Sequence, residues 1–186
     1  MSALIGISLP ACRIDGQRIS IRRTDSGATL WPAPVDRDEQ LIVGLGNPES
    51  RYTDTPHNVG YEVADRLATS WGLKWDKNPE VWFARGSVNG QAVCLLKMRL
   101  AMNLTGPGLK QLSETMRFSP EQCILVFDDL DLPLGAVKTR IKGSAGGHRG
   151  VASILEAFQT DAIRRVKIGV GNGDKDRSRH LCCEGI

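Results

Sequence analysis

The sequence lacks several features by which large protein classes are recognised. No apolar run approaches the roughly 18 residues of a membrane span, because even the strongly apolar stretch 123–127 stops at Asp128. The five cysteines are an odd number without C-x-x-C spacing, which argues against a disulfide framework and against a zinc ribbon. We therefore expect no membrane span and a reducing compartment, and we take the cytoplasm as the location.

The motifs of nucleotide binding and of covalent catalysis are missing as well. There is no G-x-x-x-x-G-K-[ST] loop, and the turn 44–49 fails as a dinucleotide fingerprint because Pro48 removes an N–H and Glu49 stands where Gly or Ala is needed. No G-x-S-x-G elbow or activated cysteine motif offers a nucleophile. We expect no cofactor and no metal, and an enzyme of this sequence would use activated water.

Length and composition fit a single globular domain. The chain has 186 residues, of which 41% are hydrophobic and 24% charged. Apolar residues at Val59, Val63 and Leu67 have helical spacing, and Asn89-Gly90 is a strong hairpin signal between two apolar stretches. The patterns predict helices over 59–71, 104–117 and 151–158 and strands over 41–45, 81–88, 92–96, 123–127, 137–141 and 166–170. This order predicts an α/β fold, a mixed but mostly parallel sheet with helices on both faces.

The two ends of the chain have no periodic apolar face. We expect residues 1–40 to be a poorly ordered extension, 41–171 to be the folded domain, and 172–186 to be a divergent or truncated tail. Arginines in the extension leave an organelle transit segment as the alternative to a cytoplasmic location.

Polar residues gather where predicted strands end. Asn47 follows the first strand, Asp128 directly follows the strand 123–127, and His57 lies just before the helix 59–71. Ligands of open α/β sheets bind at the carboxyl ends of the strands. A carboxylate bound to one imidazole nitrogen stabilises the imidazolium, so the second nitrogen can take a proton from water. The sequence thus predicts a general-base pair of His57 and Asp128, with a magnesium site at the acidic turn 128–131 as the alternative.

Positive charge is concentrated in one segment. Residues 138–167 hold seven basic and two acidic residues, while the whole chain has a formal charge of +3. The Gly-rich stretch 143–150, whose backbone N–H groups can approach an anion, lies inside this segment. A polyanion partner would need such a segment, although a solvated surface is the commoner explanation of a charge run.

Five blocks in order resemble the bacterial-type peptidyl-tRNA hydrolases over residues 41–171. They are Gly44-Leu45-Gly46-Asn47-Pro48, Thr55-Pro56-His57-Asn58-Val59-Gly60, Met102-Asn103-Leu104-Thr105-Gly106, the stretch 128–135, and Gly146-Gly147-His148-Arg149-Gly150. The resemblance implies hydrolysis of the ester between peptide and tRNA by a monomer without metal or cofactor. It also implies that the family's C-terminal lid and helix are missing after Gly171.

The resemblance also implies roles for single residues. His57 would be the general base, Asp128 its supporting carboxylate, and Asn47 the residue that discriminates peptidyl from aminoacyl esters. The implied substrate-binding residues are Tyr52, Asn58, Ala101, Asn103 and Arg149, and the implied contacts to tRNA phosphates are Lys138, Arg140, Lys142 and Lys167. Capping of a helix is the ordinary alternative for Asn103.

Four positions depart from the family pattern: Glu49, Pro56, Ala101 and Arg149 replace Gly, Arg, Phe and Asn. These changes and the shortened end keep a second hypothesis open, a non-catalytic RNA-binding or partner-binding relative such as the organellar splicing factors. The intact His57, Asp128, Asn47 and Asn103 favour the enzyme.

Overall fold

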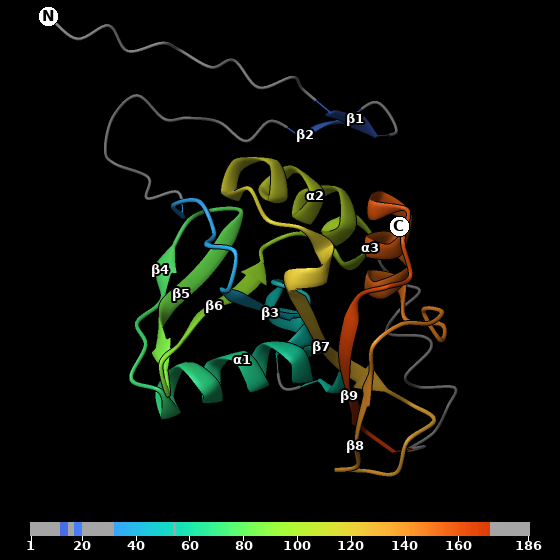
Figure 1. Cartoon of the computed structure of the whole chain (residues 1–186). Helices are drawn as coiled ribbons and strands as arrows, with labels where there is room; N and C mark the ends of the chain where they lie inside the picture. Colours follow the sequence, from blue (N-terminus) through green and yellow to red (C-terminus); the bar gives the residue numbers. More distant parts are fainter. Residues whose placement is uncertain (1–11, 15–16, 20–31, 54, 172–186) are drawn as a thin grey trace, which may run out of the picture.

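The computed structural model describes residues 12–14, 17–19, 32–53 and 55–171, and its centre is one mixed sheet (Figure 1). Seven strands lie in the order β4-β5-β6-β3-β7-β9-β8. Their bounds are β3 Gln40–Gly44, β4 Asp76–Lys77, β5 Val81–Val88, β6 Gln91–Met98, β7 Cys123–Asp129, β8 Val137–Arg140 and β9 Arg164–Gly169. The predicted α/β fold is therefore confirmed.

The sheet is more evenly mixed than the sequence suggested. The pairs β3–β6, β3–β7 and β7–β9 are parallel, whereas β4–β5, β5–β6 and β8–β9 are antiparallel. The hairpin at Asn89-Gly90 forms as predicted, with both turn residues at positive φ. The parallel strands occupy the middle, so β3, β7 and β9 end at the same edge.

Helices cover both faces of the sheet, as expected. The helix α1 (Val59–Ser70) lies on one face, and α2 (Thr105–Met116) and α3 (Arg149–Phe158) lie on the other (Figure 1). Pro107 is tolerated because it stands in the first turn of α2, where its missing N–H needs no partner. Short 3-10 turns precede three of the longer elements: η2 (Pro56–Asn58), η3 (Met102–Leu104) and η4 (Pro120–Gln122); η1 (Ser50–Tyr52) lies in the loop after β3.

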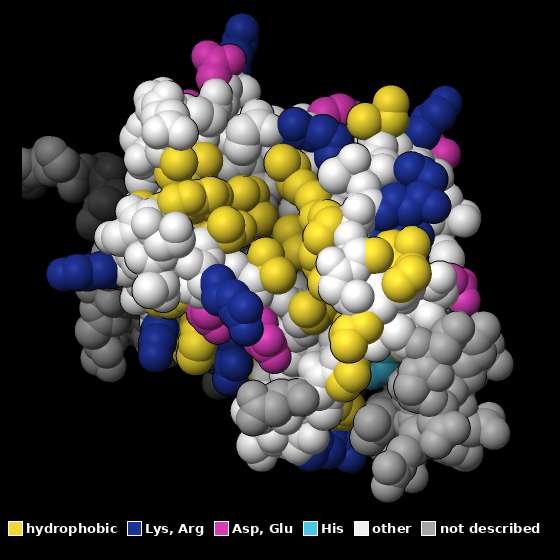
Figure 2. All heavy atoms as spheres, turned by 90° about the horizontal axis from the view of Figure 1, so that it is seen from below, with side chains coloured by type: hydrophobic (Ala, Val, Ile, Leu, Met, Phe, Trp, Pro, Cys, Tyr) yellow, Lys and Arg dark blue, Asp and Glu magenta, His cyan; other side chains and the backbone are white. Residues whose placement is uncertain are grey.

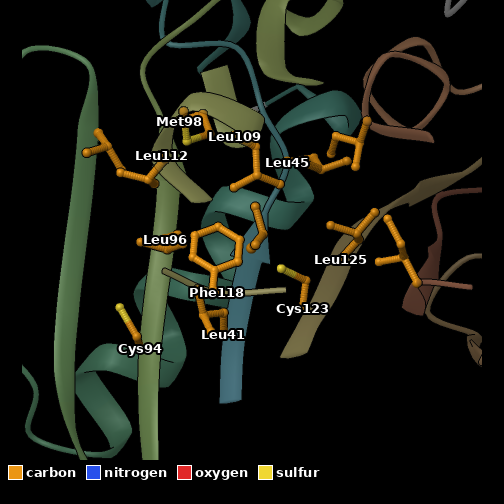
Figure 3. Packing of buried hydrophobic residues seen from close by; sticks show 14 of the residues in the cluster. Leu41, Leu45, Cys94, Leu96, Met98, Leu109, Leu112, Phe118, Cys123 and Leu125 are labelled. Carbon is orange, nitrogen blue, oxygen red and sulfur yellow. The ribbon is translucent and has the colours of Figure 1, made fainter. Parts of the chain in front are cut away.

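The main core lies between the sheet and the pair α2–α3. Leu41, Leu96, Leu109 and Leu125 are fully buried there, and Figure 3 shows such side chains converging from β3, β6, β7 and α2. A smaller core under α1 joins Ala68, Ala84 and Leu95 with half-buried neighbours. Figure 2 shows further hydrophobic side chains at the surface of this lower side of the molecule.

The predicted boundary at residue 41 is wrong. The backbone N–H of Val35 donates to Met116 O at 2.6 Å, and Glu39 is buried in an ion pair with Arg85, the two side chains being 2.5 Å apart. Residues 35–39 are held to the domain by a hydrogen bond and an ion pair. Such polar contacts need no periodic apolar residues, so the apolar pattern of the sequence did not reveal them. The ordered domain therefore begins no later than residue 32.

The N-terminal extension also contains a short antiparallel pair that the sequence pattern did not indicate, β1 (Cys12–Ile14) with β2 (Gln17–Ile19). The remaining expectations for residues 1–31 and for the tail 172–186 lie outside the described residues.

Candidate active site

The loop after β3 is held by the side chain of Asn58. Its Oδ1 accepts from the Asn47 N–H at 2.7 Å, while its Nδ2 donates to Asn47 O at 3.2 Å and to Tyr52 O at 2.8 Å. Asn58, which was expected to bind substrate, thus has its amide engaged with the backbone of this loop. The Asn47 side chain accepts from the Glu49 N–H at 3.1 Å, which forms a local turn.

Backbone packing explains why this loop approaches α1 so closely. A Cβ on Gly60, in the first turn of α1, would lie 2.3 Å from Val126 O and 2.4 Å from Leu45 O. A Cβ on Gly46 would meet the Tyr61 ring at 2.6 Å. Because these two residues are glycines, the start of α1 can contact the ends of β3 and β7. His57 directly precedes α1, so this contact places His57 at the edge of the sheet.

His57 and Asp128 form the predicted pair. His57 Nδ1 lies 2.8 Å from Asp128 Oδ2, and the two side chains are 10% and 3% exposed. The histidine comes from η2 and the carboxylate from the end of β7, as expected from their places in the sequence. The carboxylate contacts Nδ1, so Nε2 is the nitrogen that would exchange a proton with water.

A second histidine, not among the residues predicted for the site, completes this cluster. His148 Nε2 lies 3.1 Å from Asp128 Oδ1, so each carboxylate oxygen faces one imidazole. The available signal was the Gly146-Gly147-His148-Arg149-Gly150 block, which the sequence analysis used as an anion-binding loop and as part of the resemblance, without a role for His148. The contact joins residues twenty positions apart, which no local pattern reports.

The two histidines keep Asp128 ionised. Burial alone would raise the pKa of its carboxyl group, but the hydrogen bonds from His148 and His57, with the attraction of both rings, outweigh burial and hold the pKa well below its usual range. An ionised Asp128 can stabilise a positive charge that develops on His57. This is the support that a general base needs.

Asn103 contacts α3 through its backbone and does not cap α2 with its side chain. It stands inside η3 and is exposed, and the N-cap residue of α2 is Leu104. The backbone C=O of Asn103 accepts from Ser153 Oγ of α3 at 2.7 Å, and Ser153 Oγ accepts from the Gly106 N–H at 3.0 Å. Ser153 therefore fixes η3 against α3 and leaves the Asn103 amide on the surface.

The other expected substrate contacts differ in exposure. Tyr52 is buried beneath the guanidinium of Arg51, 4.9 Å from its ring centre, and Arg149 is exposed as the first residue of α3. Ala101 is half-buried and precedes η3. A substrate could contact the exposed Arg149 and the accessible part of Ala101, whereas the Tyr52 ring is part of the packed loop.

The departures at Glu49 and Pro56 cause no local conflict. Glu49 pairs with Arg51 at 2.9 Å on the surface. Pro56 is the first residue of η2, a position that needs no N–H donor.

Basic residues of the two neighbouring strands β8 and β9 lie on one face of the sheet, at its edge. Lys138 and Arg140 of β8 lie opposite Lys167 and Arg165 of β9, and directly opposed residues point to the same side. Lys138, Arg140 and Lys142 are exposed, whereas Lys167 is paired with Asp129 at 2.9 Å. Lys167 Nζ lies 5.8 Å from the centre of the Phe127 ring, and that ring lies 4.9 Å from the ring of His148, so this basic face begins near the histidine cluster.

Within the described residues, no group of three or more His, Cys, Asp or Glu side chains is arranged to hold a metal ion. Asp128 faces the two histidines and Asp129 faces Lys167, so these carboxylates do not converge. Burial raises the pKa of the Cys94 and Cys123 thiols to about 12, so neither is a ready nucleophile. No helix in the same part of the chain is long and apolar enough to cross a membrane.

The fold and the cluster define an α/β protein with a histidine–carboxylate site at the carboxyl edge of its sheet, of the kind that can activate water. Comparison with known proteins narrows this class. The family model described as Peptidyl-tRNA hydrolase matches residues 41–182, so the chain belongs to the peptidyl-tRNA hydrolase family.

Curated relatives and solved structures support the same family. Peptidyl-tRNA hydrolase of Synechocystis sp. is 41% identical over 146 residues, 76% of this chain and 75% of the relative, and that of Aquifex aeolicus is 44% identical over 141 residues, 74% and 72%. The crystal structure of peptidyl-tRNA hydrolase from Acinetobacter baumannii superimposes with a TM-score of 0.71 at 33% identity, covering 78% of this chain and 76% of that one.

Proposed function

We propose that this chain hydrolyses the ester bond between the peptide and the 3′ ribose of peptidyl-tRNA, with His57 as the general base that activates water. Membership of the family supports the reaction, and the geometry of His57 and Asp128 supports the assignment of the base. The observation that carries the assignment is the 2.8 Å contact between His57 Nδ1 and the buried Asp128 carboxylate.

In the proposed reaction, His57 Nε2 takes a proton from water while the water oxygen attacks the ester carbonyl carbon. Asp128 stabilises the imidazolium that forms. The tetrahedral intermediate then breaks its bond to the ribose 3′ oxygen, and that oxygen takes the proton from the imidazolium. The products are a tRNA with a 3′ hydroxyl and a peptide carboxylic acid, which becomes a carboxylate by releasing the second proton of the water to the solvent. General-base assistance supplies about 10²–10⁴ of the rate, so positioning and stabilisation of the oxyanion must supply the rest.

Residues around the cluster would hold the substrate. We assign Asn47 to discriminating a peptidyl from an aminoacyl ester, because an amide can bond to the groups of a peptide linkage. The exposed Asn103 and Arg149 and the half-buried Ala101 would line the path of the peptide and the RNA end. Tyr52 and Asn58 would act on the substrate through the loop that they hold in place.

The exposed Lys138, Arg140 and Lys142 would bind tRNA phosphates. Lys167 would do so only in exchange with its partner Asp129, which makes it the weakest of the four assignments. Phosphate contacts position an RNA without touching the scissile bond, so the basic face and the cluster would have separable effects.

We also take the protein to act as a monomer in the cytoplasm. Sedimentation at micromolar concentration tests the first part: a single species of the chain's mass is expected without tRNA, and a complex of one chain with one tRNA when tRNA is added. Cys94 and Cys123 are buried and not joined in a disulfide, which fits a reducing compartment.

The test is single-turnover hydrolysis of purified peptidyl-tRNA by the wild type and by His57→Ala. We expect His57→Ala to be slower by about 10²–10⁴, the range of general-base catalysis. Binding of a tRNA that carries the peptide through a stable amide bond should be unchanged, because an imidazole adds little to phosphate attraction near neutral pH.

Arg66→Ala is the matched control, since Arg66 is an exposed residue of α1 whose ionic partner, Glu62, lies 3.9 Å away. It should keep the wild-type rate. A wild type that binds the RNA but never cleaves it would instead identify a non-catalytic relative.

A further inference from the structure

His148 has a place in the cluster that the general-base mechanism does not use. Asp128 accepts at both oxygens, Oδ2 from His57 at 2.8 Å and Oδ1 from His148 at 3.1 Å. A carboxylate with a single donor can rotate about its Cβ–Cγ bond. A second donor on the other oxygen fixes that rotation and so fixes the direction in which Oδ2 meets His57.

The hydrogen bonds of His148 identify its tautomer. The Val151 N–H donates to Nδ1 at 3.2 Å, so this nitrogen carries no proton. The ring proton must then be on Nε2, where it is donated to Asp128 Oδ1. His148 thus acts as a donor to Asp128 and as the N-cap of α3 through its two different nitrogens.

Packing holds the His148 ring in this orientation. The Phe127 ring lies 4.9 Å away, centre to centre, tilted by 59°. A Cβ at Gly150 would lie 3.2 Å from His148 Cε1 and 2.4 Å from Met102 Sδ, so the backbone of Gly150 packs closely beside the ring. With a side chain only 8% exposed, His148 is part of a preorganised site.

We propose that His148 is a positioning residue for the hydrolysis: its Nε2–H orients the Asp128 carboxylate and withdraws part of its negative charge, which sets how strongly Asp128 holds a proton on His57. The proposal rests on the proposed function. Without this donor, Asp128 would be a stronger acceptor toward His57, so His57 would remain protonated to a higher pH and would be a poorer base below that pH.

The charged groups around Asp128 do not replace this donor. From η2 comes His57, and from the start of α3 come His148 and the exposed Arg149. On the strands β7 and β9, Asp129 and Lys167 are paired with each other at 2.9 Å. Of the hydrogen bonds identified among the described residues, only those from the two histidines reach the Asp128 carboxylate.

Two variants separate the two bonds of His148. An Asn side chain places its oxygen near the position of Nδ1, so His148→Asn keeps a cap for α3 but cannot reach Asp128. A Gln side chain places its NH₂ near the position of Nε2, so His148→Gln keeps a donor to Asp128 but loses the cap. Both variants are measured in the full chain, by the pH profile of kcat and KM for peptidyl-tRNA and by thermal unfolding.

We expect His148→Asn to lower kcat about tenfold at neutral pH, as loss of a hydrogen bond to a charged group does, with little change in KM or melting temperature. The acid limb of its kcat–pH profile should move to higher pH than in the wild type. His148→Gln should retain the wild-type acid limb and lose melting temperature instead. An NMR titration of the His57 ring, in a chain with only three histidines, should show the same shift without any turnover.

The proposal is overturned if His148→Asn has the wild-type kcat and acid limb, or if both variants differ from the wild type only in melting temperature. In either case an active wild type and an inactive His57→Ala would leave the proposed function intact. An inactive wild type would refute the proposed function itself, and the NMR titration would still decide whether His148 acts on His57.

Discussion

At the scale of single residues, Asp128 links the chemistry of the site to the stability of the fold. Its pKa is raised by burial but is held well below its usual range by the hydrogen bonds from His148 and His57. For a carboxyl group with a lowered pKa in the folded state, the stabilisation is present above the pKa of the unfolded chain and is lost as the pH falls toward the folded-state pKa.

Asp128→Asn should therefore lower the free energy of unfolding near pH 7, by about 1–3 kcal/mol, since an amide NH₂ would face an N–H donor in the cluster. The deficit relative to the wild type should shrink as the pH falls from 5 toward 2, because only the wild type loses the contribution of Asp128. Urea unfolding at several pH values measures this. A deficit that stays constant or grows would show that Asp128 is not held ionised by its partners.

Lys97 carries a buried ammonium group away from the cluster. Its Nζ pairs with Asp65 at 2.5 Å and lies 4.5 Å from the Trp75 ring and 4.9 Å from the Trp82 ring. Burial lowers its pKa more than Asp65 raises it. The unfolded chain therefore binds the proton more tightly, and the free energy of unfolding rises as the pH increases through the folded-state pKa toward 10.5.

We expect Lys97→Met to change the free energy of unfolding by less than about 1 kcal/mol at pH 7, because an apolar side chain of similar length avoids the cost of burying a charge. As the pH rises toward 10.5, the wild type should gain stability relative to this variant. Lys74→Met, at an exposed position next to the same region, should show no such trend. Equal pH trends for both variants would contradict this explanation of Lys97.

At the scale of elements, the close approach of α1 to β3 and β7 sets the position of the histidine. A Cβ at Gly60 would lie 2.3 Å from Val126 O, which the backbone cannot accommodate without moving. Gly60→Ala should lower the free energy of unfolding by about 1–3 kcal/mol or more and slow hydrolysis by displacing His57. Glu62→Ala, at a half-exposed position two residues further along α1, is the control and should change neither the stability nor the rate of hydrolysis. Chemical unfolding and single-turnover hydrolysis measure the two effects.

The elements themselves could be predicted from local patterns, and the ends of the three helices to within two residues, whereas the contacts between elements could not. Asn89-Gly90 predicted the hairpin of β5 and β6, and the helical spacing of apolar residues predicted α1, because both signals lie within a short stretch of sequence. The ends of α2 and α3 carry no glycine: Arg117 and Gln159 take up the left-handed conformation there. The helix ends could therefore not be located from the usual C-terminal signal.

The candidate site was predictable in its main pair and not in its third member. His57 and Asp128 each stand where a predicted element meets the edge of the sheet, so general rules for α/β sheets bring them together. His148 reaches Asp128 only because the loop before α3 folds back toward β7, which depends on tertiary packing. The segment 32–40 was missed for the same reason, since it is held by Arg85 and by the Met116 C=O.

At the scale of the whole molecule, the exposed basic residues of β8 and the histidine cluster should act on different steps. Replacing Lys138 and Arg140 together by Ala should weaken tRNA binding and reduce the slope of log K against log salt by roughly 0.7–0.9 for each phosphate that is no longer neutralised. Hydrolysis of a minimal ester substrate should be nearly unchanged. Fluorescence anisotropy over a range of salt concentrations measures the binding.

The matched control removes two charges elsewhere, Arg66 on α1 and the nearby Lys74, both exposed. It should leave the salt slope unchanged. An equal reduction of the slope in both double variants would mean that tRNA responds to net charge and not to this face of the sheet.

The central claim is that His57 and Asp128 act as one unit, and a double-mutant cycle in single-turnover hydrolysis tests it most directly. Rates are measured for the wild type, His57→Ala, Asp128→Asn and the double variant at one pH. The predicted result is that the double variant is no slower than His57→Ala, because removing Asp128 costs nothing once the base is gone. Rates that multiply independently, or a His57→Ala protein with the wild-type rate, would contradict the claim.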